Sequence, residues 1–393
     1  EKNQKKKNML NVLTVFKDDL LFDENKRNAI QNYKYSGEDQ SLLAPFMYKI
    51  WSKFFFLVPK RISPNVITIC GLFIVSLSFV IIQMNNWSND CLNCFLFGLA
   101  LFIYQTTDAL DGMQGKRVHM YENATTEIFD HGIDSIVTSL TSLTTISLLR
   151  HINRNVSPIY SLMILLTSFI GFHSPTFEHV VTRKMRFQIG FCNPTEALIG
   201  MQLFYFLTSI YPSIWTHKQA QFMLISILIP ILFISSILTF YSSIKQIYFY
   251  HKNDLILTIK SILIGYSPLF FVIISSYFYL FKIESFSNKH SLLCLIVLTI
   301  PWNYSIYRTI IIEITNDQHF PTLKVLLGQS PILLPILSAY FCPSIHFLSI
   351  ICSIGLSAFL YIYTVHLTLA EVCQALSMEH FWIVKKDPIR QAK

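Results

Sequence analysis

Charged residues are scarce in this chain of 393 residues: Asp, Glu, Lys and Arg together make up 14% of it. An ordinary soluble domain carries about 25% charged residues, so this composition disfavours a water-soluble fold. Hydrophobic residues make up 52% of the chain, and aromatic residues make up 15%. The shortage of charge and the apolar excess together predict an integral membrane protein.

Glycine and paired cysteines are few as well. The 12 glycines and 15 prolines exclude a collagen-like or low-complexity chain. Eight cysteines are present, but Cys91 and Cys94 have no second pair with which to complete a zinc site. We therefore expect the cysteines to be buried or interfacial thiols that behave as small apolar residues.

Long apolar blocks dominate the rest of the sequence. A helix that crosses the hydrocarbon core of a bilayer needs about 20 mainly apolar residues, and about ten segments meet this need. The predicted spans are 65–84, 91–107, 134–149, 157–173, 196–212, 219–243, 256–281, 291–312, 323–341 and 344–368. We therefore expect an all-α integral membrane protein with about ten transmembrane helices.

An apolar run is absent before Asn65, so we expect no cleavable signal peptide and a cytosolic leader. Basic residues are concentrated there, which places this side of the membrane in the cytosol. These residues are Lys2, Lys5, Lys6, Lys7, Lys17, Lys26, Arg27, Lys34, Lys60 and Arg61. An even number of spans returns Lys385 and Lys386 to the same face. The net charge of +8 then favours membrane lipids as partners and not nucleic acid.

Three regions are expected along the chain. Residues 1–43 form the leader, 44–243 contain the catalytic core with the first six spans, and 244–393 contain four further spans and a cytosolic tail. The core begins with a predicted interfacial helix at 44–57, because apolar residues recur there at helical spacing. These are Phe46, Ile50, Phe54 and Leu57.

Four aspartates stand at the ends of two predicted spans. Asp108 and Asp111 close the second span, whereas Asp130 and Asp134 open the third. Residues three or four apart share one face of a helix, so each pair points in one direction. Ionisable groups at membrane depth are costly and usually serve a function. We therefore expect the two pairs to face each other as a carboxylate cage.

Such a cage calls for cations. Four neighbouring carboxylates repel each other unless divalent ions neutralise them, and ligation by oxygen alone favours Mg²⁺ or Mn²⁺. Magnesium held by carboxylates commonly also binds substrate phosphates, and two ions can stabilise the attacking and leaving oxygens together. The sequence therefore predicts a substrate that carries a diphosphate.

Further residues suited to phosphate chemistry flank the aspartates. Glu127 and His131 lie on the same helical stripe as Asp130 and Asp134. Gly112 leaves room for close approach of a nucleotide to the backbone. Lys116 and Arg117 add positive charge for phosphate oxygens.

The segments 108–112 and 130–134 resemble the signature of the CDP-alcohol phosphotransferase family. The longer runs 104–114 and 127–132 are similar to its choline/ethanolamine phosphotransferase branch. Further similarity lies at 33–39, 41–43, 64–68, 177–179, 182 and 193–196, so that the resemblance covers about residues 33–200. It implies the helical core of that family, preceded by the interfacial helix.

The resemblance also implies an activity and residue roles. A diacylglycerol hydroxyl would attack the alcohol-bearing phosphate of CDP-choline or CDP-ethanolamine, with release of CMP and formation of a phospholipid. The four aspartates would hold two metal ions, His131 would take the proton of the hydroxyl, and Glu127 would orient His131. The remaining implied contacts are with the CDP-alcohol: Asn65, Gly112, Lys116, Arg117, Glu178 and Glu196. A homodimer in endoplasmic reticulum or Golgi membranes, with its site facing the cytosol, is implied as well.

Departures from the family pattern leave alternatives open. Gly115 and Lys116 stand where the family has Ala-Arg, Thr126 replaces a glycine, and the spacer is one residue longer. A binding or regulatory pseudoenzyme is one alternative, and a cation transporter with aspartates along its ion path is another. We expect His151, His173 and His179 to be loop or interface histidines, not metal ligands.

Overall fold

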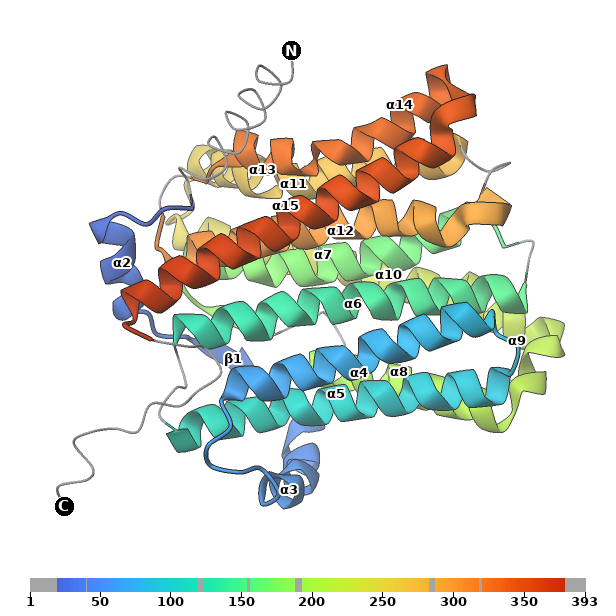
Figure 1. Ribbon diagram of the computed structural model, residues 1–393, viewed down its shortest axis with the longest axis horizontal. Helices are drawn as coiled ribbons and strands as arrows, with labels where there is room; N and C mark the ends of the chain where they lie inside the picture. Colours follow the sequence, from blue (N-terminus) through green and yellow to red (C-terminus); the bar gives the residue numbers. More distant parts are fainter. Residues whose placement is uncertain are drawn as a thin grey trace, which may run out of the picture.

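Long helices form nearly all of the structure, a computed structural model that describes residues 20–39, 41–118, 123–153, 156–187, 193–282, 287–317 and 320–378 (Figure 1). The axes of the long helices lie roughly along one direction, so the helices form a bundle. Two three-residue strands, β1 (Gly37–Asp39) and β2 (Met185–Phe187), pair in parallel at one end. The predicted all-α class is confirmed, apart from this short pair.

The first half of the chain forms seven α-helices among the described residues. They are α2 (Glu24–Gln31), α3 (Ala44–Phe55), α4 (Pro64–Asn85), α5 (Asp90–Val118), α6 (Ala124–Ile152), α7 (Pro158–Thr182) and α8 (Pro194–Ile210). The second half follows with α9 (Lys218–Phe222), a π-helical turn at Met223–Leu228, α10 (Ile229–Tyr250), α11 (Leu255–Lys282), α12 (Ser287–Ile314), α13 (Thr322–Gln329), α14 (Leu333–Phe341) and α15 (His346–Ala375).

Eight helical segments in the described part of the chain are long and apolar enough to cross a membrane. The other two predicted spans fall in α5 and α8. α8 has only 17 residues, and α5 carries polar side chains at both of its ends. The count of about ten spans therefore stays a prediction for these two helices.

α7 corrects one expectation about the chain. The fourth span was predicted to end at 173, but α7 continues as a helix to Thr182 despite Pro175. Every residue from His173 to His179 is buried there. Tertiary packing outweighs the local cost of a proline within a helix, and periodicity in the sequence does not report that packing.

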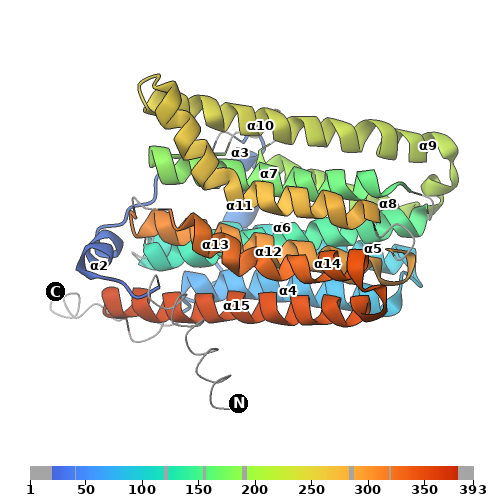
Figure 2. The same cartoon turned by 90° about the horizontal axis from the view of Figure 1, so that it is seen from above.

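α12 lies inside the bundle. It contacts α6, α7, α11 and α15, and Figure 2 shows it between α11 and α15. Of its apolar stretch 89% is buried, against 28% for the stretch that contains α15. Side chains of α12 are therefore well placed to contribute to an internal site, whereas α15 offers most of its surface to lipid.

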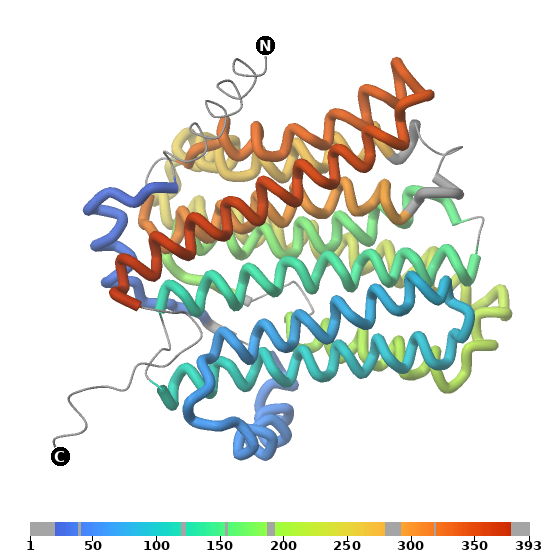
Figure 3. The backbone as a smooth tube through the Cα atoms, in the orientation of Figure 1, coloured from blue at the N-terminus to red at the C-terminus, as the bar shows by residue number. Residues whose placement is uncertain are grey.

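The described leader lies against the carboxyl end of α15. Arg27 pairs with Glu371 at 3.1 Å, and Lys26 pairs with Asp317 at 3.0 Å. The backbone tube shows this blue segment beside the red end of α15 (Figure 3). The residues before 20, and Lys385 and Lys386, lie outside the described residues. The predicted cytosolic orientation of this end stays a prediction.

The predicted interfacial helix is α3. Its expected apolar face is largely exposed, with Phe46 at 62% and Phe54 at 41% of full exposure, whereas Met47 and Trp51 are buried. An exposed apolar face beside a membrane bundle suits the interface between lipid and water. Its membrane role stays a prediction.

Gly265 gives a test of the packing between α7 and α11. A Cβ atom at this position would overlap the buried ring of Phe177. We expect Gly265→Ala to destabilise the protein by about 1–3 kcal/mol, as overpacking does, and to lower the midpoint of thermal unfolding in detergent. Gly355→Ala is the control, because its Cβ would meet no atom within 4 Å. Equal midpoints for both variants would contradict this packing.

Candidate metal and catalytic site

Carboxylates from two consecutive helices, both packed against α4, converge at one end of the bundle. Asp108 of α5 and Asp130 and Asp134 of α6 each offer an oxygen within 4.8 Å of the others. All three are half-buried, and none of the described lysines or arginines forms an ion pair with them. The predicted cage is thus present as a three-carboxylate cluster. Such a set of hard oxygen donors fits a divalent cation such as Mg²⁺ or Mn²⁺.

Neighbouring hydroxyl groups hold the aspartates in place. Asp111 is 2% exposed and accepts a hydrogen bond from the hydroxyl of Thr68 on α4. Tyr104, one turn before Asp108, donates a hydrogen bond to Asp134. These bonds leave each carboxylate with further oxygen lone pairs for a ligand. Asp111 therefore lies beside the cluster but is tied to α4.

His131 and Glu127 form a close pair on successive turns of α6. Nδ1 of His131 lies 2.6 Å from Oε1 of Glu127. Both side chains are buried, at 3% and 5% exposure. Because Glu127 engages Nδ1, any proton exchange with a substrate would fall to Nε2, and that role stays a prediction. The pair has the arrangement that its spacing predicts.

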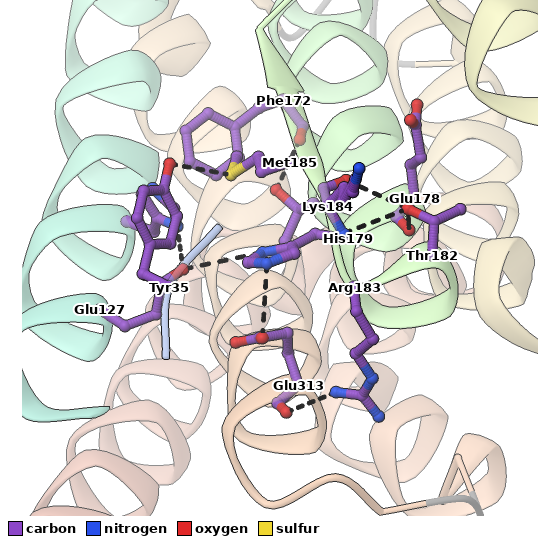
Figure 4. A network of polar contacts seen from close by, with 12 residues as sticks. Tyr35, Glu127, Phe172, Glu178, His179, Thr182, Arg183, Lys184, Met185 and Glu313 are labelled. Carbon is purple, nitrogen blue, oxygen red and sulfur yellow. Dashed lines mark hydrogen bonds and ion pairs between the residues drawn. The ribbon is translucent and has the colours of Figure 1, made fainter. Parts of the chain in front are cut away.

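Two further buried side chains, His179 and Glu313, lie close to Glu127 (Figure 4). His179 of α7 has Nδ1 3.9 Å from Oε1 of Glu127 and Nε2 3.5 Å from Oε1 of Glu313 on α12. The ring of Tyr35 meets the rings of His131 and His179 edge-on, with centroids 5.7 and 5.8 Å apart. Three helices and the leader thus meet around one carboxylate.

The expectation for two histidines was wrong. His173 and His179 are neither loop nor interface residues, because both are buried within α7. His151 instead lies at a helix end, where it pairs with Asp90 at 3.0 Å. Glu313 was also missed, although a lone acid within an apolar span is itself a signal of function.

Three of the residues predicted to face a nucleotide lie around the same end of α4 and α5. Asn65 is buried in the first turn of α4. Gly112 follows Asp111 directly, and a Cβ added to it would meet no atom within 4 Å. Lys116 is exposed in the last turn of α5. Open space and positive charge therefore lie next to the aspartates.

Arg117 has contacts of another kind. Its guanidinium donates to the carbonyl oxygen of Val58 at 2.7 Å and lies 4.4 Å from the centre of the Phe55 ring. It also donates to Gln114. Arg117 thus ties α5 to the segment between α3 and α4, and its proposed role toward phosphate stays a prediction.

Glu178 and Glu196 likewise anchor nearby segments. Glu178 accepts a hydrogen bond from Arg186 of β2 at 2.6 Å. Glu196, in the first turn of α8, accepts one from the backbone N–H of Leu43 at 2.9 Å, just before α3. These contacts shape the surroundings of the site, and direct contact with a nucleotide stays a prediction for both.

An apolar pocket of about 310 Å³ opens between α3, α4 and α5. Phe54, Val58, Ile67 and Leu110 are among the side chains that line it. Leu110 immediately precedes Asp111, so the pocket reaches the neighbourhood of the aspartates. Its lining suits an aliphatic chain and offers little to a polar ligand.

Known proteins similar to this chain carry related names. Cholinephosphotransferase 1 of Saccharomyces cerevisiae is 31% identical over 197 residues, which cover 48% of this chain and 49% of that protein. Choline/ethanolaminephosphotransferase 1 of Arabidopsis thaliana is 30% identical over 196 residues, 49% of this chain and 48% of that protein. Both alignments therefore span about half the length of these relatives. No family model matches the chain.

A third relative is aligned along nearly its full length. It is an uncharacterized CDP-alcohol phosphatidyltransferase class-I family protein 3 of Dictyostelium discoideum, 26% identical over 403 residues, 92% of this chain and 98% of that protein. The predicted resemblance to the CDP-alcohol phosphotransferase family is confirmed. The segments that resemble the signature of that family lie at the carboxyl end of α5 and the amino end of α6, where Asp108, Asp130 and Asp134 converge.

Proposed function

We propose that this protein transfers phosphocholine or phosphoethanolamine from CDP-choline or CDP-ethanolamine to the hydroxyl of diacylglycerol. The observation that carries the proposal is the carboxylate cluster of α5 and α6 beside the His131–Glu127 pair. A cation path explains the carboxylates but has no use for a buried imidazole held by a carboxylate. A transferase uses both groups, because one faces phosphate and the other can take a proton.

Divalent ions belong to this proposal. Asp108, Asp130 and Asp134, with Asp111 beside them, would hold Mg²⁺ or Mn²⁺, two ions by the family resemblance. Bound ions would supply charge neutralisation for the diphosphate and for the leaving CMP. Lys116 and the open backbone at Gly112 would receive the nucleotide side of the substrate, with Asn65 behind them.

His131 and Glu127 would have different roles in the proton transfer. Nε2 of His131 would take the proton of the diacylglycerol hydroxyl as its oxygen bonds to the alcohol-bearing phosphorus. The bond from that phosphorus to the CMP oxygen breaks, and CMP leaves with the bonding electrons. Glu127 accepts the hydrogen bond from Nδ1 and stabilises the imidazolium that forms.

The lipid acceptor fits the apolar pocket between α3, α4 and α5. Its volume of about 310 Å³ suits part of an acyl chain, with the hydroxyl directed toward the aspartates. By the family resemblance, we place the protein in endoplasmic reticulum or Golgi membranes as a homodimer, with the site facing the cytosol. The apolar surface of the bundle supports the membrane location.

A head-group transfer assay tests the proposal directly. Membranes that contain the protein are supplied with diacylglycerol, Mg²⁺ or Mn²⁺, and one labelled CDP-alcohol at a time. We expect release of CMP together with a labelled lipid, and the label that is transferred identifies the alcohol. Binding of CDP-alcohol without any turnover would indicate a pseudoenzyme, and metal flux without nucleotide binding would indicate a transporter.

Gly112 provides a test of the nucleotide side. Because an added Cβ would meet no protein atom within 4 Å, Gly112→Ala should leave the thermal unfolding midpoint unchanged. We expect it to weaken binding of labelled CDP-alcohol by about 10-fold, because the methyl group would occupy space needed by the ligand. Gly355→Ala, equally open but on α15, should change neither quantity. Unaltered CDP-alcohol binding in Gly112→Ala would contradict this placement of the nucleotide.

A further inference from the structure

We propose that His179 and Glu313 are positioning residues that fix Glu127, and through it His131, for head-group transfer. The inference rests on the proposed function. It extends the site beyond the motif helices, because His179 lies on α7 and Glu313 lies on α12.

Distances and burial define a continuous chain of four side chains. Glu313, His179, Glu127 and His131 follow one another with oxygen–nitrogen distances of 3.5, 3.9 and 2.6 Å. Their exposed fractions are between 3% and 5%. Carboxylate and imidazole groups alternate along the chain, so every carboxylate faces an imidazole and His179 faces one carboxylate with each nitrogen.

The charges around the chain leave the imidazoles as the main partners of the carboxylates. Arg183 comes near, but it donates to the backbone oxygen of Glu313 at 2.9 Å and to Asn316. No described lysine or arginine forms an ion pair with Glu127 or Glu313. Burial, together with the charges of Glu127 and Glu313, raises the pKa of Tyr33, so this phenol stays neutral.

Each member of the chain is held by a different element. Glu127 and His131 share α6, whereas His179 is carried by α7 and packed against the ring of Tyr35 from the leader. Glu313 comes from the enclosed helix α12. If His179 is lost, Glu127 keeps its bond to His131 but loses its contact on the other side. If Glu313 is lost, His179 loses the carboxylate that holds its Nε2. The ring of His131 is then less well oriented for the substrate hydroxyl, while the nucleotide site is untouched.

Two substitutions, each of which leaves a neutral polar amide in place, test this inference in purified protein. We expect His179→Gln and Glu313→Gln each to lower kcat about 10- to 100-fold, as is typical when a group that orients a functional side chain is removed. KM for the CDP-alcohol should stay within about 2-fold, because neither residue faces the nucleotide. The double variant should be no slower than the slower single variant, since residues that act as a unit are not additive.

Matched controls separate positioning from folding. His173→Gln changes a histidine of the same helix that is equally buried but bonds to the carbonyl of Gly265 at 3.1 Å. Glu371→Gln changes a carboxylate that pairs with Arg27. Both should keep wild-type kcat. If Glu313→Gln does not fold, Glu313→Asp is used instead, and it should retain more activity than His179→Gln.

A readout without turnover distinguishes this inference from the proposed function. The ring nitrogens of His131 are followed by nitrogen NMR in histidine-labelled protein, with the signal assigned from the His131→Ala spectrum. We expect the Nδ1 signal of His131 to shift in His179→Gln and Glu313→Gln but not in His173→Gln. An unmoved signal, or unchanged kcat in both variants, overturns the inference. If the wild type transfers no head group, yet the two variants show these shifts, the proposed function is overturned and the contact chain from Glu313 to His131 is supported.

Discussion

Asp130→Asn is expected to abolish head-group transfer. Asp130 shares the cluster with Asp108 and Asp134, each offering an oxygen within 4.8 Å of the others. The substitution removes one negative charge and replaces a carboxylate oxygen by an amide, which weakens binding of a hard divalent cation. Several kcal/mol of transition-state stabilisation depend on such an ion, so we expect a loss on the order of 10³-fold or more. The head-group transfer assay, titrated with Mg²⁺ and Mn²⁺, measures it.

Asp90→Asn is the matched control for this substitution. Asp90 lies at the opposite end of α5, where it pairs with His151 at 3.0 Å. Its variant should retain wild-type activity. Binding of Mn²⁺, measured by electron paramagnetic resonance, should weaken in Asp130→Asn and not in Asp90→Asn. Full turnover of the wild type in excess chelator would rule out the metal cluster as the source of activity.

The convergence of the aspartates follows only in part from local sequence rules. Asp108 and Asp111, and Asp130 and Asp134, have spacings that place each pair on one helical face. The two helices are consecutive in the chain, but both pack against α4. The structure brings three of the four together and ties Asp111 to Thr68 of α4. That tie depends on the packing of a third helix, and helical spacing alone does not predict it.

Long-range contacts explain what the sequence pattern missed. His179 and Glu127 are far apart in the chain, and Glu313 lies beyond the stretch that resembles the family. Nothing in their local patterns shows that α7 and α12 meet behind α6. Arg117 is the opposite case: its position beside the motif suggested phosphate binding, yet its described contacts are with Val58, Phe55 and Gln114. The position of a residue along a helix predicts which region of the protein it lies in, but not which groups its side chain contacts.

Under the proposed positioning role, the carboxyl-terminal half of the chain contributes to the same site as α6 and α7. α12 is mostly enclosed and carries Glu313 to within 3.5 Å of His179. The leader adds Tyr35, whose ring contacts both His131 and His179. The division into a core at 44–243 and further spans at 244–393 remains a prediction about the sequence. The contacts indicate that the two parts share one buried polar chain.

His131→Ala is expected to lower turnover by about 10²- to 10⁴-fold, the usual contribution of a general base. His131 is buried beside the aspartate cluster, and Nδ1 is engaged by Glu127 at 2.6 Å. Removing the ring leaves the aspartates and the open space at Gly112 in place. Binding of labelled CDP-alcohol should therefore change little, so that the loss falls on kcat. The measurement pairs the transfer assay with direct binding of the nucleotide.

Glu127→Gln should cost less than His131→Ala, because the base stays present. The amide can still accept a hydrogen bond from Nδ1 of His131, but it brings no negative charge to stabilise the imidazolium. The two variants thus separate the base from the group that orients it. If His131→Ala turns over at the wild-type rate, another group takes the proton of the acceptor. If Glu127→Gln is the slower variant, Glu127 does more than orient His131. His179 and Glu313 then position the residue that contributes most to turnover.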